Sequence, residues 1–473
     1  MTMKKVAIIG AGSMAFSSRM VADILTYDTL RDTQFALVDT DPARLQYAER
    51  ITRRIFKEGG YTKASCTAAR DRRSVLKDCD FVITSILVGG YPAIEAEIDI
   101  PMKYGVSQAI GDTLTPGGIM RCLRTLPVLA EVMRDVRELC PRAQVLNYTN
   151  PMGMLCWGMT HAAPAVRLVG LCHSVQGCLQ DWAQRLQVPQ NEINFVCAGI
   201  NHQAWMLRME RDGVDLLPRV RALALNPEIW LGDTSRMEYV KHFGYPVTES
   251  SGHNSEYSPW FRKNQATVAQ YCPRGGWNGE HGFIKKLYDR KDWRKQMNAM
   301  ATWKQPINLA RSVEYGSQIV NAMVGGDACV IYGNVPNTNL IENLPPGCCV
   351  EVPCYVNKNG VQPLHVGALP THLAAINRMQ ISAQQLAVEA ALEADPEKVF
   401  QAMALDPLTA AICTLDQIRA MTRELLAAHR PFLPTFKGKT LAAKPVLIGC
   451  KVKQAERHVD PAEARLRRRA RKK

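Results

Sequence analysis

The chain has 473 residues, 47% of them hydrophobic, which is enough for two or more domains with a large buried core. No stretch approaches the roughly 18 uninterrupted apolar residues of a membrane span, and the fifteen cysteines lack C-x-x-C spacing. The net charge of +14 is concentrated at one end, because residues 437–473 hold thirteen Lys or Arg against three Asp or Glu. These features argue against a membrane protein and a disulfide-rich secreted protein, and they predict a globular protein of the reducing cytoplasm.

The first predicted element is a β-branched strand, residues 5–9, which leads into Gly10, Gly12 and a helix. In such a turn the first glycine permits the bend, the second lets a pyrophosphate approach, and the third position needs a small residue, here Ala15. The next predicted strand ends at Asp39, whose carboxylate can accept hydrogen bonds from a ribose 2′-hydroxyl and so favours NAD over NADP. This start is unlike a secretory signal. We predict a dinucleotide site formed by Gly10, Gly12, Ser13 and Asp39, with a glycine turn of another α/β protein as the alternative.

Further strands are predicted at residues 80–87, 144–146 and 166–171, with helical patterns between them. This alternation predicts an α/β fold with a Rossmann-like, doubly wound parallel sheet. Ligands of such sheets bind beyond the carboxyl ends of the strands. The Gly-rich, Asn-rich and Cys-His segments of this chain all fall there.

The pattern changes after about residue 200 to longer helical stretches with irregular connectors. We therefore predict an NAD-binding domain over residues 1–174, an α+β substrate and metal domain over 175–433, and a basic, disordered tail over 434–473. Without residues 437–473 the chain has 45 basic and 41 acidic residues, so its body is nearly neutral. We expect the tail to be solvated, with RNA, DNA or anionic lipid binding as the weaker alternative.

Cys172 and His202 are candidate metal ligands. Cys172 follows the strand at 166–171, and His202 follows a strand-like run at 193–196. A thiolate and an imidazole at the same rim of a sheet would suit a divalent first-row metal such as Mn, Fe, Co or Ni. On spacing alone, a buried core cysteine and a hydrogen-bonded histidine are the more frequent outcome.

Asp112 and Asn150 lie on loops shaped by glycine and proline, in the segments IGDTLTPGG and NYTNP. Polar side chains at such positions suit sugar hydroxyls, although many only close turns. Residues 248–257, TESSGHNSEY, form a dense polar string. The string is consistent with a solvated loop, or with a wall of a carbohydrate pocket that carries a base.

Together these residues resemble the family 4 glycoside hydrolases, which depend on NAD and manganese, and are most similar to the α-galactosidase (melibiase) branch. The similarity runs from about residue 5 to 433, and the basic tail departs from it. The segments that carry it are IIGAGSMAF, ALVDTDPARL, DFVITSILVGGY, IGDTLTPGGIMRCLRTLP, VLNYTNPM, VGLCHSVQG, CAGINHQAW, VTESSGHNSEY, VIYGNVPN, NLPPGCCVEVPC and HVGALPTHLAA.

The resemblance implies hydrolysis by oxidation at C3 of the sugar with NAD⁺, removal of the C2 proton, elimination of the leaving group, addition of water and return of the hydride. It implies that Cys172 and His202 bind Mn²⁺ or another divalent first-row metal. His173 then resembles the acid that protonates the leaving group. The base is Glu249 or Tyr257, of which we favour Glu249, and the implied substrate contacts are Asp112 and Asn150.

We expect a small α-galactoside such as melibiose as the substrate and a homodimer or homotetramer as the assembly. α-Glucosidase and α-galacturonidase activity within the same family remain open, because few pocket residues distinguish these sugars. The rival enzyme class is an NAD-dependent 2-hydroxy-acid dehydrogenase. A non-enzymatic alternative is a nucleotide sensor or nucleic-acid-binding protein that uses the tail, but we expect no nucleic-acid or membrane partner.

Overall fold

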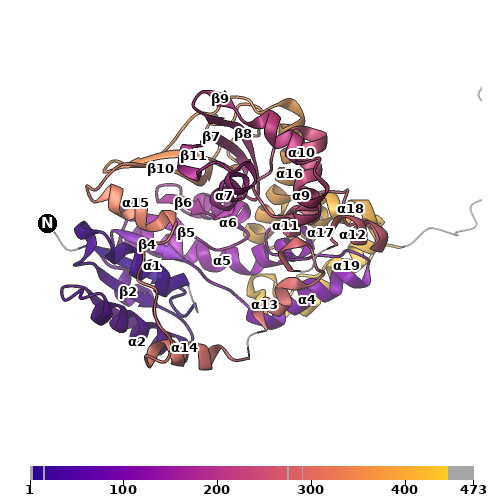
Figure 1. The fold of residues 1–473 in the computed structure, drawn as a ribbon. Helices are drawn as coiled ribbons and strands as arrows, with labels where there is room; N and C mark the ends of the chain where they lie inside the picture. The colour runs from indigo at the N-terminus through magenta and orange to yellow at the C-terminus, as the bar shows by residue number, and fades with distance from the viewer. Residues whose placement is uncertain (1–3, 14–15, 274–275, 290, 446–473) are drawn as a thin grey trace, which may run out of the picture. The chain divides into compact units, whose positions relative to one another are not determined.

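The computed structural model describes residues 4–13, 16–273, 276–289 and 291–445. Within these residues the strands form one twelve-stranded mixed sheet (Figure 1). The strands are β1 (Lys5–Ile9), β2 (Gln34–Val38), β3 (Ser65–Ala69), β4 (Phe81–Thr84), β5 (Gln144–Asn147), β6 (Arg167–Leu171), β7 (Asn194–Ile200), β8 (Gln203–Arg211), β9 (Val214–Asp215), β10 (Cys329–Pro336), β11 (Cys349–Asn357) and β12 (Gly360–Pro363).

The N-terminal half of the sheet is parallel. Its order is β3-β2-β1-β4-β5-β6, which is the order of a Rossmann fold. All four residues of β4 and of β5 are buried, because helices cover both faces of a parallel sheet and leave no solvated face for alternating polar residues. The predicted doubly wound parallel sheet is therefore confirmed.

Alternate residues of β1 enter two different cores, one on each face of the sheet. Val6 and Ile8 pack with residues of α1 and α2, whereas Ala7 and Ile9 pack with residues of α5. This is the two-residue period of an extended strand. The helices of this half are α1 (Phe16–Leu25), α2 (Pro42–Glu58), α3 (Arg73–Leu76), α4 (Gly90–Lys103), α5 (Thr115–Leu139), α6 (Met152–Ala162) and α7 (Ser174–Leu186).

The C-terminal half continues the same sheet with antiparallel strands. β10 runs antiparallel to β6, with Gly333 opposite Leu171, and β11, β7, β8 and β9 follow in that order. The α+β character predicted for this half is confirmed. The join between the halves lies at the end of β6, directly before Cys172.

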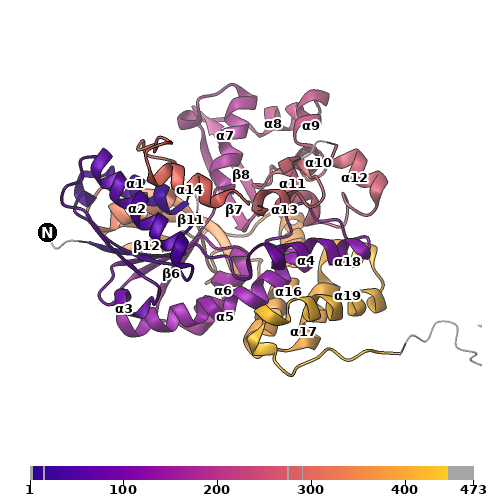
Figure 2. The ribbon, with the colours of Figure 1, turned by 90° about the horizontal axis from the view of Figure 1, so that it is seen from below.

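The remaining helices pack partly on the antiparallel strands and partly on helices of the N-terminal half, where α14 contacts α2 and both α13 and α19 contact α4. In Figures 1 and 2 the yellow C-terminal helices lie beside α4, and Lys103 at the end of α4 pairs with Glu424 of α19. These helices are α8 (Leu217–Leu223), α9 (Pro227–Gly232), α10 (Thr234–Phe243), α11 (Ser251–Glu256), α12 (Gln265–Tyr271), α13 (Phe283–Tyr288), α14 (Trp293–Ala301), α15 (Tyr315–Met323), α16 (Thr371–Glu393), α17 (Pro396–Leu405), α18 (Pro407–Ile412) and α19 (Leu415–Ala428).

The described residues up to Leu441 form one compact unit. The predicted boundary at residues 174/175 falls at the start of α7, and the sheet continues across it, so the two predicted domains share one sheet. Of the predicted tail, the part from residue 446 lies outside the described residues. Among the helices that the structure describes, none is long and apolar enough to cross a bilayer.

Candidate active site

The loop after β1 is shaped by its glycines. Gly10 has a φ of +91°, and its amide donates to the carbonyl of Val38 at 2.9 Å. A Cβ on Gly10 would lie 2.0 Å from the carbonyl oxygen of Ser85, and one on Gly12 would lie 2.6 Å from Oδ2 of Asp39. Both positions therefore require glycine. The loop is held close against the ends of β2 and β4, as a backbone that approaches a pyrophosphate requires.

Asp39 lies beside this loop, directly after β2. Its Oδ2 accepts from the amide of Gly12 at 2.8 Å, and its Oδ1 accepts from the amide of Asp41 at 2.9 Å. Arg44 donates to the carbonyl of Gly12 at 3.1 Å, and its guanidinium lies 4.1 Å from the ring centroid of Trp293 in α14. A carboxylate at a strand end next to a glycine loop is the acceptor that NAD-binding folds offer to ribose hydroxyls. The residues present thus fit a dinucleotide.

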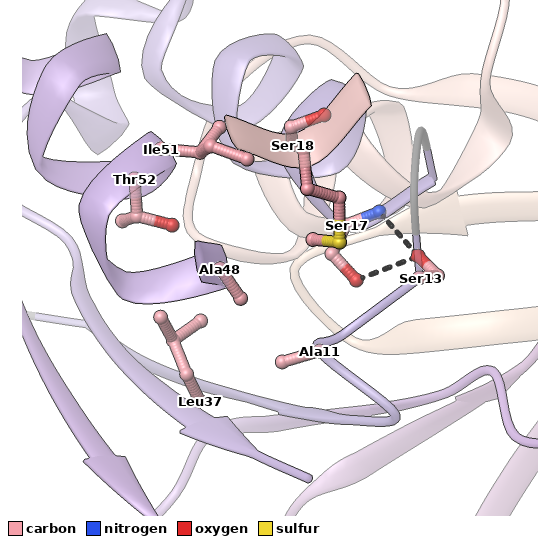
Figure 3. Close-up of a pocket in the computed structure, with 9 residues that line it drawn as sticks. Ala11, Ser13, Ser17, Ser18, Leu37, Ala48, Ile51 and Thr52 are labelled. Carbon is pink, nitrogen blue, oxygen red and sulfur yellow. Dashed lines mark hydrogen bonds between the residues drawn. The ribbon is translucent and has the colours of Figure 1, made fainter. Parts of the chain in front are cut away.

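Ser13 lies in the segment before α1. Figure 3 shows its hydroxyl oxygen beside Ser17, where it accepts from the Ser17 amide at 3.0 Å and lies 3.0 Å from the Ser17 hydroxyl. The role predicted for Ser13 in cofactor binding stays a prediction, and the predicted small residue Ala15 lies outside the described residues. Both serines line a small pocket between α1 and α2, together with Ala11, Ser18, Leu37, Ala48, Ile51, Thr52 and Met297.

Cys172, His202 and Glu249 converge from three segments. Cys172 follows β6, His202 lies between β7 and β8, and Glu249 precedes α11. His202 Nε2 lies 3.1 Å from Cys172 Sγ and 3.3 Å from Glu249 Oε2, and one donor atom of each residue lies within 4.8 Å of the others. A thiolate, an imidazole and a carboxylate at this spacing are suitable donors for Mn, Fe, Co or Ni. The residues present therefore fit a divalent first-row metal.

The three groups of this cluster stabilise one another in their charged forms. Burial opposes ionisation of the Cys172 thiol, but the adjacent His202 lowers its pKa to about 6. Burial opposes protonation of His202, but Cys172 and Glu249 raise its pKa to about 9. Against the effect of burial, His202 and His253 hold the pKa of Glu249 well below its usual range. Two anionic side chains around one exchangeable proton can accept a metal ion in place of that proton.

Tyr257 contacts the other nitrogen of His202. Its hydroxyl lies 3.0 Å from Nδ1, where the hydroxyl of Thr113 is also within 3.1 Å. Tyr257 is fully buried, and burial raises its pKa well above the usual value. Hydrogen bonds at the second nitrogen orient a metal-binding imidazole. The two candidates for the base are thus separated, with Glu249 facing Nε2 of His202 and Tyr257 facing Nδ1.

Asp112 and Asn150 lie together, as predicted for substrate contacts. Asn150 Nδ2 donates to Asp112 Oδ2 at 3.4 Å, where Arg121 Nη1 also lies at 3.4 Å, and the Thr113 hydroxyl donates to Asp112 Oδ1 at 2.8 Å. Against the effect of burial, His253 and Arg121 hold the pKa of Asp112 well below its usual range. An ionised carboxylate beside an amide can accept and donate hydrogen bonds to sugar hydroxyls.

His253 links the carboxylates of Asp112 and Glu249, and it was not among the site residues predicted from the sequence. Its Nε2 lies 3.3 Å from Asp112 Oδ1 and its Nδ1 lies 3.3 Å from Glu249 Oε1. Its ring stacks on that of His202 with 4.7 Å between centroids. A signal was present in the polar string, because His253 stands four residues after Glu249, a spacing that brings side chains together over one helical turn.

Buried charged groups fix the backbone on both sides of this cluster. The carboxylate of Glu256 accepts from the backbone amides of residues 109–111 at 2.7, 3.2 and 2.9 Å. Arg236 donates to the carbonyl oxygens of Thr248 and Glu249, both at 3.0 Å. The loop before Asp112 and the backbone of Glu249 are therefore held in place before any ligand binds.

His173, adjacent to Cys172 in sequence, lies at the edge of the cluster with its side chain 58% exposed. Its Nε2 is 2.5 Å from Oε1 of Glu314, and its ring centroid is 6.3 Å from that of Tyr148. The hydrogen bond that His173 donates to the Glu314 carboxylate raises the pKa of His173. An accessible imidazole that is stabilised as a cation is a suitable proton donor.

The predicted site residues thus form two groups near the carboxyl ends of the parallel strands, the location at which such sheets bind ligands, with His173 at the edge of the second group. Gly10, Gly12, Ser13 and Asp39 lie around the ends of β1 and β2. The second group is connected by the contacts described above and contains Asp112, Asn150, Cys172, His202, Glu249 and Tyr257.

Comparison with known proteins identifies two matching family models. Residues 5–188 match the family 4 glycosyl hydrolase model, and residues 197–409 match the model of the family 4 glycosyl hydrolase C-terminal domain. An alpha-galactosidase of Bacillus subtilis (strain 168) is 38% identical over 446 residues, which cover 92% of this chain and 100% of the relative. An alpha-galactosidase of Rhizobium meliloti (strain 1021) is 34% identical, and the match covers 93% of this chain and 91% of the relative.

An alpha-galacturonidase of Lachnoclostridium phytofermentans is 28% identical, with 91% of this chain and 97% of the relative covered. Among solved structures, a putative glucosidase, lplD, of Bacillus subtilis has a TM-score of 0.81 and 26% identity, and the match covers 90% of this chain and 100% of the other. A 6-phospho-alpha-glucosidase from gut microorganisms, solved with NAD and Mn²⁺, has a TM-score of 0.74 at 19% identity. This match covers 91% of this chain and 99% of the other. These structures share the fold of this chain.

Proposed function

The chain belongs to the family 4 glycosyl hydrolases, and from this premise we propose that it is an α-galactosidase acting on small α-galactosides such as melibiose. The observation that carries the proposal is the thiolate, imidazole and carboxylate cluster beside the Asp112 and Asn150 pair. The two alpha-galactosidases at 38% and 34% identity support the choice of sugar. Membership of the family argues against the 2-hydroxy-acid dehydrogenase and nucleic-acid alternatives.

A neutral sugar fits this site better than a uronic acid. Arg121 is a buried cation beside the predicted substrate contacts, but Asp112 pairs with it at 3.4 Å and offsets its charge. A carboxylate at C6 of the substrate would have to compete with Asp112 for that cation. α-Galacturonidase and α-glucosidase, the activities named for relatives at 28% and 27% identity, are the alternatives within the family.

NAD and a divalent metal, Mn²⁺ in the first instance, are the proposed cofactors, supported by a solved structure of similar fold that contains both. Gly10, Gly12 and Asp39 would hold the dinucleotide, with Ser13 in the segment before α1. Cys172 and His202 would hold the metal. When bound, the nicotinamide supplies a reversible hydride acceptor and the metal supplies a positive charge beside the sugar hydroxyls.

The proton-transfer roles follow from the positions of the side chains. Glu249 is the proposed acceptor of the C2 proton, because it faces Nε2 of His202, the nitrogen that Cys172 also faces. Ser250 donates to its Oε1 from the backbone amide at 2.8 Å, which keeps the carboxylate oriented. The proposed role of Tyr257 is to orient the His202 ring through Nδ1. His173 protonates the leaving oxygen, while Asp112 and Asn150 bind sugar hydroxyls.

The test is an assay of 4-nitrophenyl α- and β-glycosides with and without NAD⁺, Mn²⁺ and a reductant. We expect hydrolysis of the α-galactoside to require NAD⁺, to stop with EDTA and to return with Mn²⁺, with no net formation of NADH. A larger kcat/KM for the α-galacturonide or the α-glucoside would contradict the proposed sugar. Net NADH without hydrolysis would contradict the proposed reaction.

We also propose that the protein works in the cytoplasm as a homodimer or homotetramer. The fourteen cysteines of the described residues are all free, which supports a reducing compartment. Light scattering after size-exclusion chromatography would give the mass of the assembly, for which a single chain of 52.7 kDa is the contradicting result.

A further inference from the structure

We propose that Glu314 is a positioning residue for the leaving-group acid: it holds Nε2 of His173, so that Nδ1 is the atom that donates the proton. This inference rests on the proposed function of His173. Glu314 lies 141 residues after His173 in the chain, and its Oε1 is 2.5 Å from Nε2. The side chain of Glu314 is 12% exposed whereas that of His173 is 58% exposed, so the carboxylate is the fixed partner of the pair.

The segment that carries Glu314 is anchored on both sides. The amide of Ser312 donates to Oδ1 of the buried Asp23 in α1 at 2.9 Å, and the Ser312 hydroxyl donates to the other oxygen of the same carboxylate. The amide of Gly316 donates to the hydroxyl of Tyr148 at 2.9 Å. A Cβ on Gly316 would lie 2.8 Å from that hydroxyl, so this close approach requires glycine.

Tyr148 connects the same segment to the predicted substrate contacts. It stands two residues before Asn150, and its ring lies near that of His173. The segment from Ser312 to Gly316 is thus fixed against α1 and against the loop that carries Asn150. A carboxylate presented from such an anchored segment can set the orientation of an exposed imidazole ring, whose torsions would otherwise be free.

The chemical consequence concerns one proton. As the C1–O bond breaks, its electron pair goes to the leaving oxygen, which takes the proton from Nδ1 of His173. The water that later adds to C1 supplies a proton back to the same nitrogen, so the ring is unchanged after a turnover. Throughout, Nε2 keeps its hydrogen bond to Glu314. An alkoxide leaving group needs this proton, whereas a nitrophenolate leaves without it.

The experiment compares methyl α-galactoside and melibiose with 4-nitrophenyl α-galactoside in the full chain with NAD⁺ and Mn²⁺. We expect Glu314→Gln to lower kcat/KM for the two alkyl substrates by about tenfold or more and to leave the nitrophenyl substrate within about twofold. Exchange of the C2 proton with solvent precedes cleavage of the C1–O bond, so it should continue in the variant. Glu314→Gln combined with His173→Gln should lose no more than His173→Gln alone.

Glu342→Gln is the matched control, because Glu342 also pairs with an exposed histidine, His365, at 3.2 Å. We expect this variant to leave kcat/KM unchanged for both the alkyl and the nitrophenyl substrates. Equal losses for alkyl and nitrophenyl substrates, or no loss for the alkyl ones, would overturn the role of Glu314. If the wild-type chain cleaves glycosides of another sugar, only the proposed α-galactosidase activity fails, and the same alkyl and aryl pair of that sugar tests Glu314. A wild-type chain that cleaves no glycoside overturns both.

Discussion

The nucleotide loop and the cluster around His202 are prepared for their ligands by different means. At Gly10 and Gly12 the determining feature is the absence of a Cβ, because neighbouring backbone and carboxylate atoms occupy the space that a side chain would need. At His202 it is charge, because Cys172 and Glu249 are held ionised by the imidazole between them. Ligand binding at the nucleotide loop should therefore be weakened by added side-chain atoms. Metal binding at the cluster should be weakened by the change of a single donor atom or by an added proton.

The largest expected effect is that of Cys172→Ser. A serine hydroxyl stays protonated at neutral pH, so the metal would lose its thiolate donor and His202 its anionic partner. We expect kcat/KM to fall by at least about a thousandfold and Mn²⁺ affinity to fall with it. NAD binding, measured by calorimetry, should be retained because the nucleotide loop is a separate group. Cys329→Ser, at another half-buried cysteine, is the control, and equal losses in both variants would refute a ligand role for Cys172.

Glu249→Gln should have the next largest effect, and it should show whether Glu249 acts as the base or as a metal ligand. The amide is isosteric but cannot take a proton, so we expect turnover and C2-proton exchange to fall about a hundredfold or more. Mn²⁺ affinity should change little if Glu249 is the base, whereas a parallel loss of Mn²⁺ affinity would make it a third metal ligand. Tyr257→Phe removes the hydroxyl's contacts to Nδ1 of His202 and to Thr113. If that variant alone lost C2-proton exchange, Tyr257 would be the base.

Gly10→Ala tests the nucleotide loop. The added Cβ would meet the carbonyl oxygen of Ser85 at 2.0 Å on a backbone with φ of +91°, so the loop must move. We expect NAD affinity to fall by about ten- to a hundredfold, since such strain costs on the order of 1–3 kcal/mol. Mn²⁺ affinity should be unchanged. Gly232→Ala, where a Cβ meets no atom within 4 Å, is the control, and an equal loss of NAD affinity there would contradict a steric cause.

A smaller effect is expected for Asp39→Asn. The amide can still accept a hydrogen bond from the Gly12 backbone, but it loses the charge that favours ribose hydroxyls and repels a 2′-phosphate. NAD affinity should fall by about tenfold or less and the preference for NAD over NADP should narrow, both measurable by calorimetry. An unchanged preference would assign the discrimination to another residue, for which Arg44 is the nearest candidate because it donates to the same loop.

The two regions also differ in how far the sequence alone could predict them. The order of glycines, strand and terminal acid is a local pattern, so the nucleotide loop and the parallel sheet were predictable. β3 (Ser65–Ala69) was not predicted, because its small and polar residues lack an apolar pattern and only pairing with β2 makes it a strand. The continuation of the sheet through β10 was equally inaccessible, since it depends on pairing between segments about 160 residues apart.

For the cluster, the sequence indicated the residue types but not their partners. Cys172 and His202 could be placed at the same rim of the sheet, yet the approach of Glu249 to both depends on where α11 begins. His253 and Glu314 were missed for the same reason: one contacts Asp112 across 141 residues of chain and the other contacts His173 across the same separation. Side-chain networks between distant segments are set by tertiary packing, which one sequence does not display.

The smallest chemical change among the predictions is the loss of a single proton from the charged cluster. The pKa of Cys172 is lowered to about 6 and that of His202 is raised to about 9. The thiolate therefore stabilises the metal-free fold fully above its unfolded pKa of about 8.5, and this contribution is lost as the pH falls through 6. The imidazolium stabilises the fold fully below about 6.5, and this contribution is lost as the pH rises through 9. Both groups are charged between pH 6 and 9.

Mn²⁺ must displace the proton of His202 within that window. Binding at pH 7.5 should thus release about one proton, measurable by calorimetry in buffers of different ionisation enthalpy, and Mn²⁺ affinity should rise about tenfold per pH unit until about pH 9. Below pH 6 the thiol also binds a proton, and the dependence should steepen. Cys172→Ser removes one of the two anions that hold the proton on His202, so proton release at pH 7.5 should fall. Affinity independent of pH between 6 and 9 would mean that the thiolate and imidazolium are not paired in the metal-free protein.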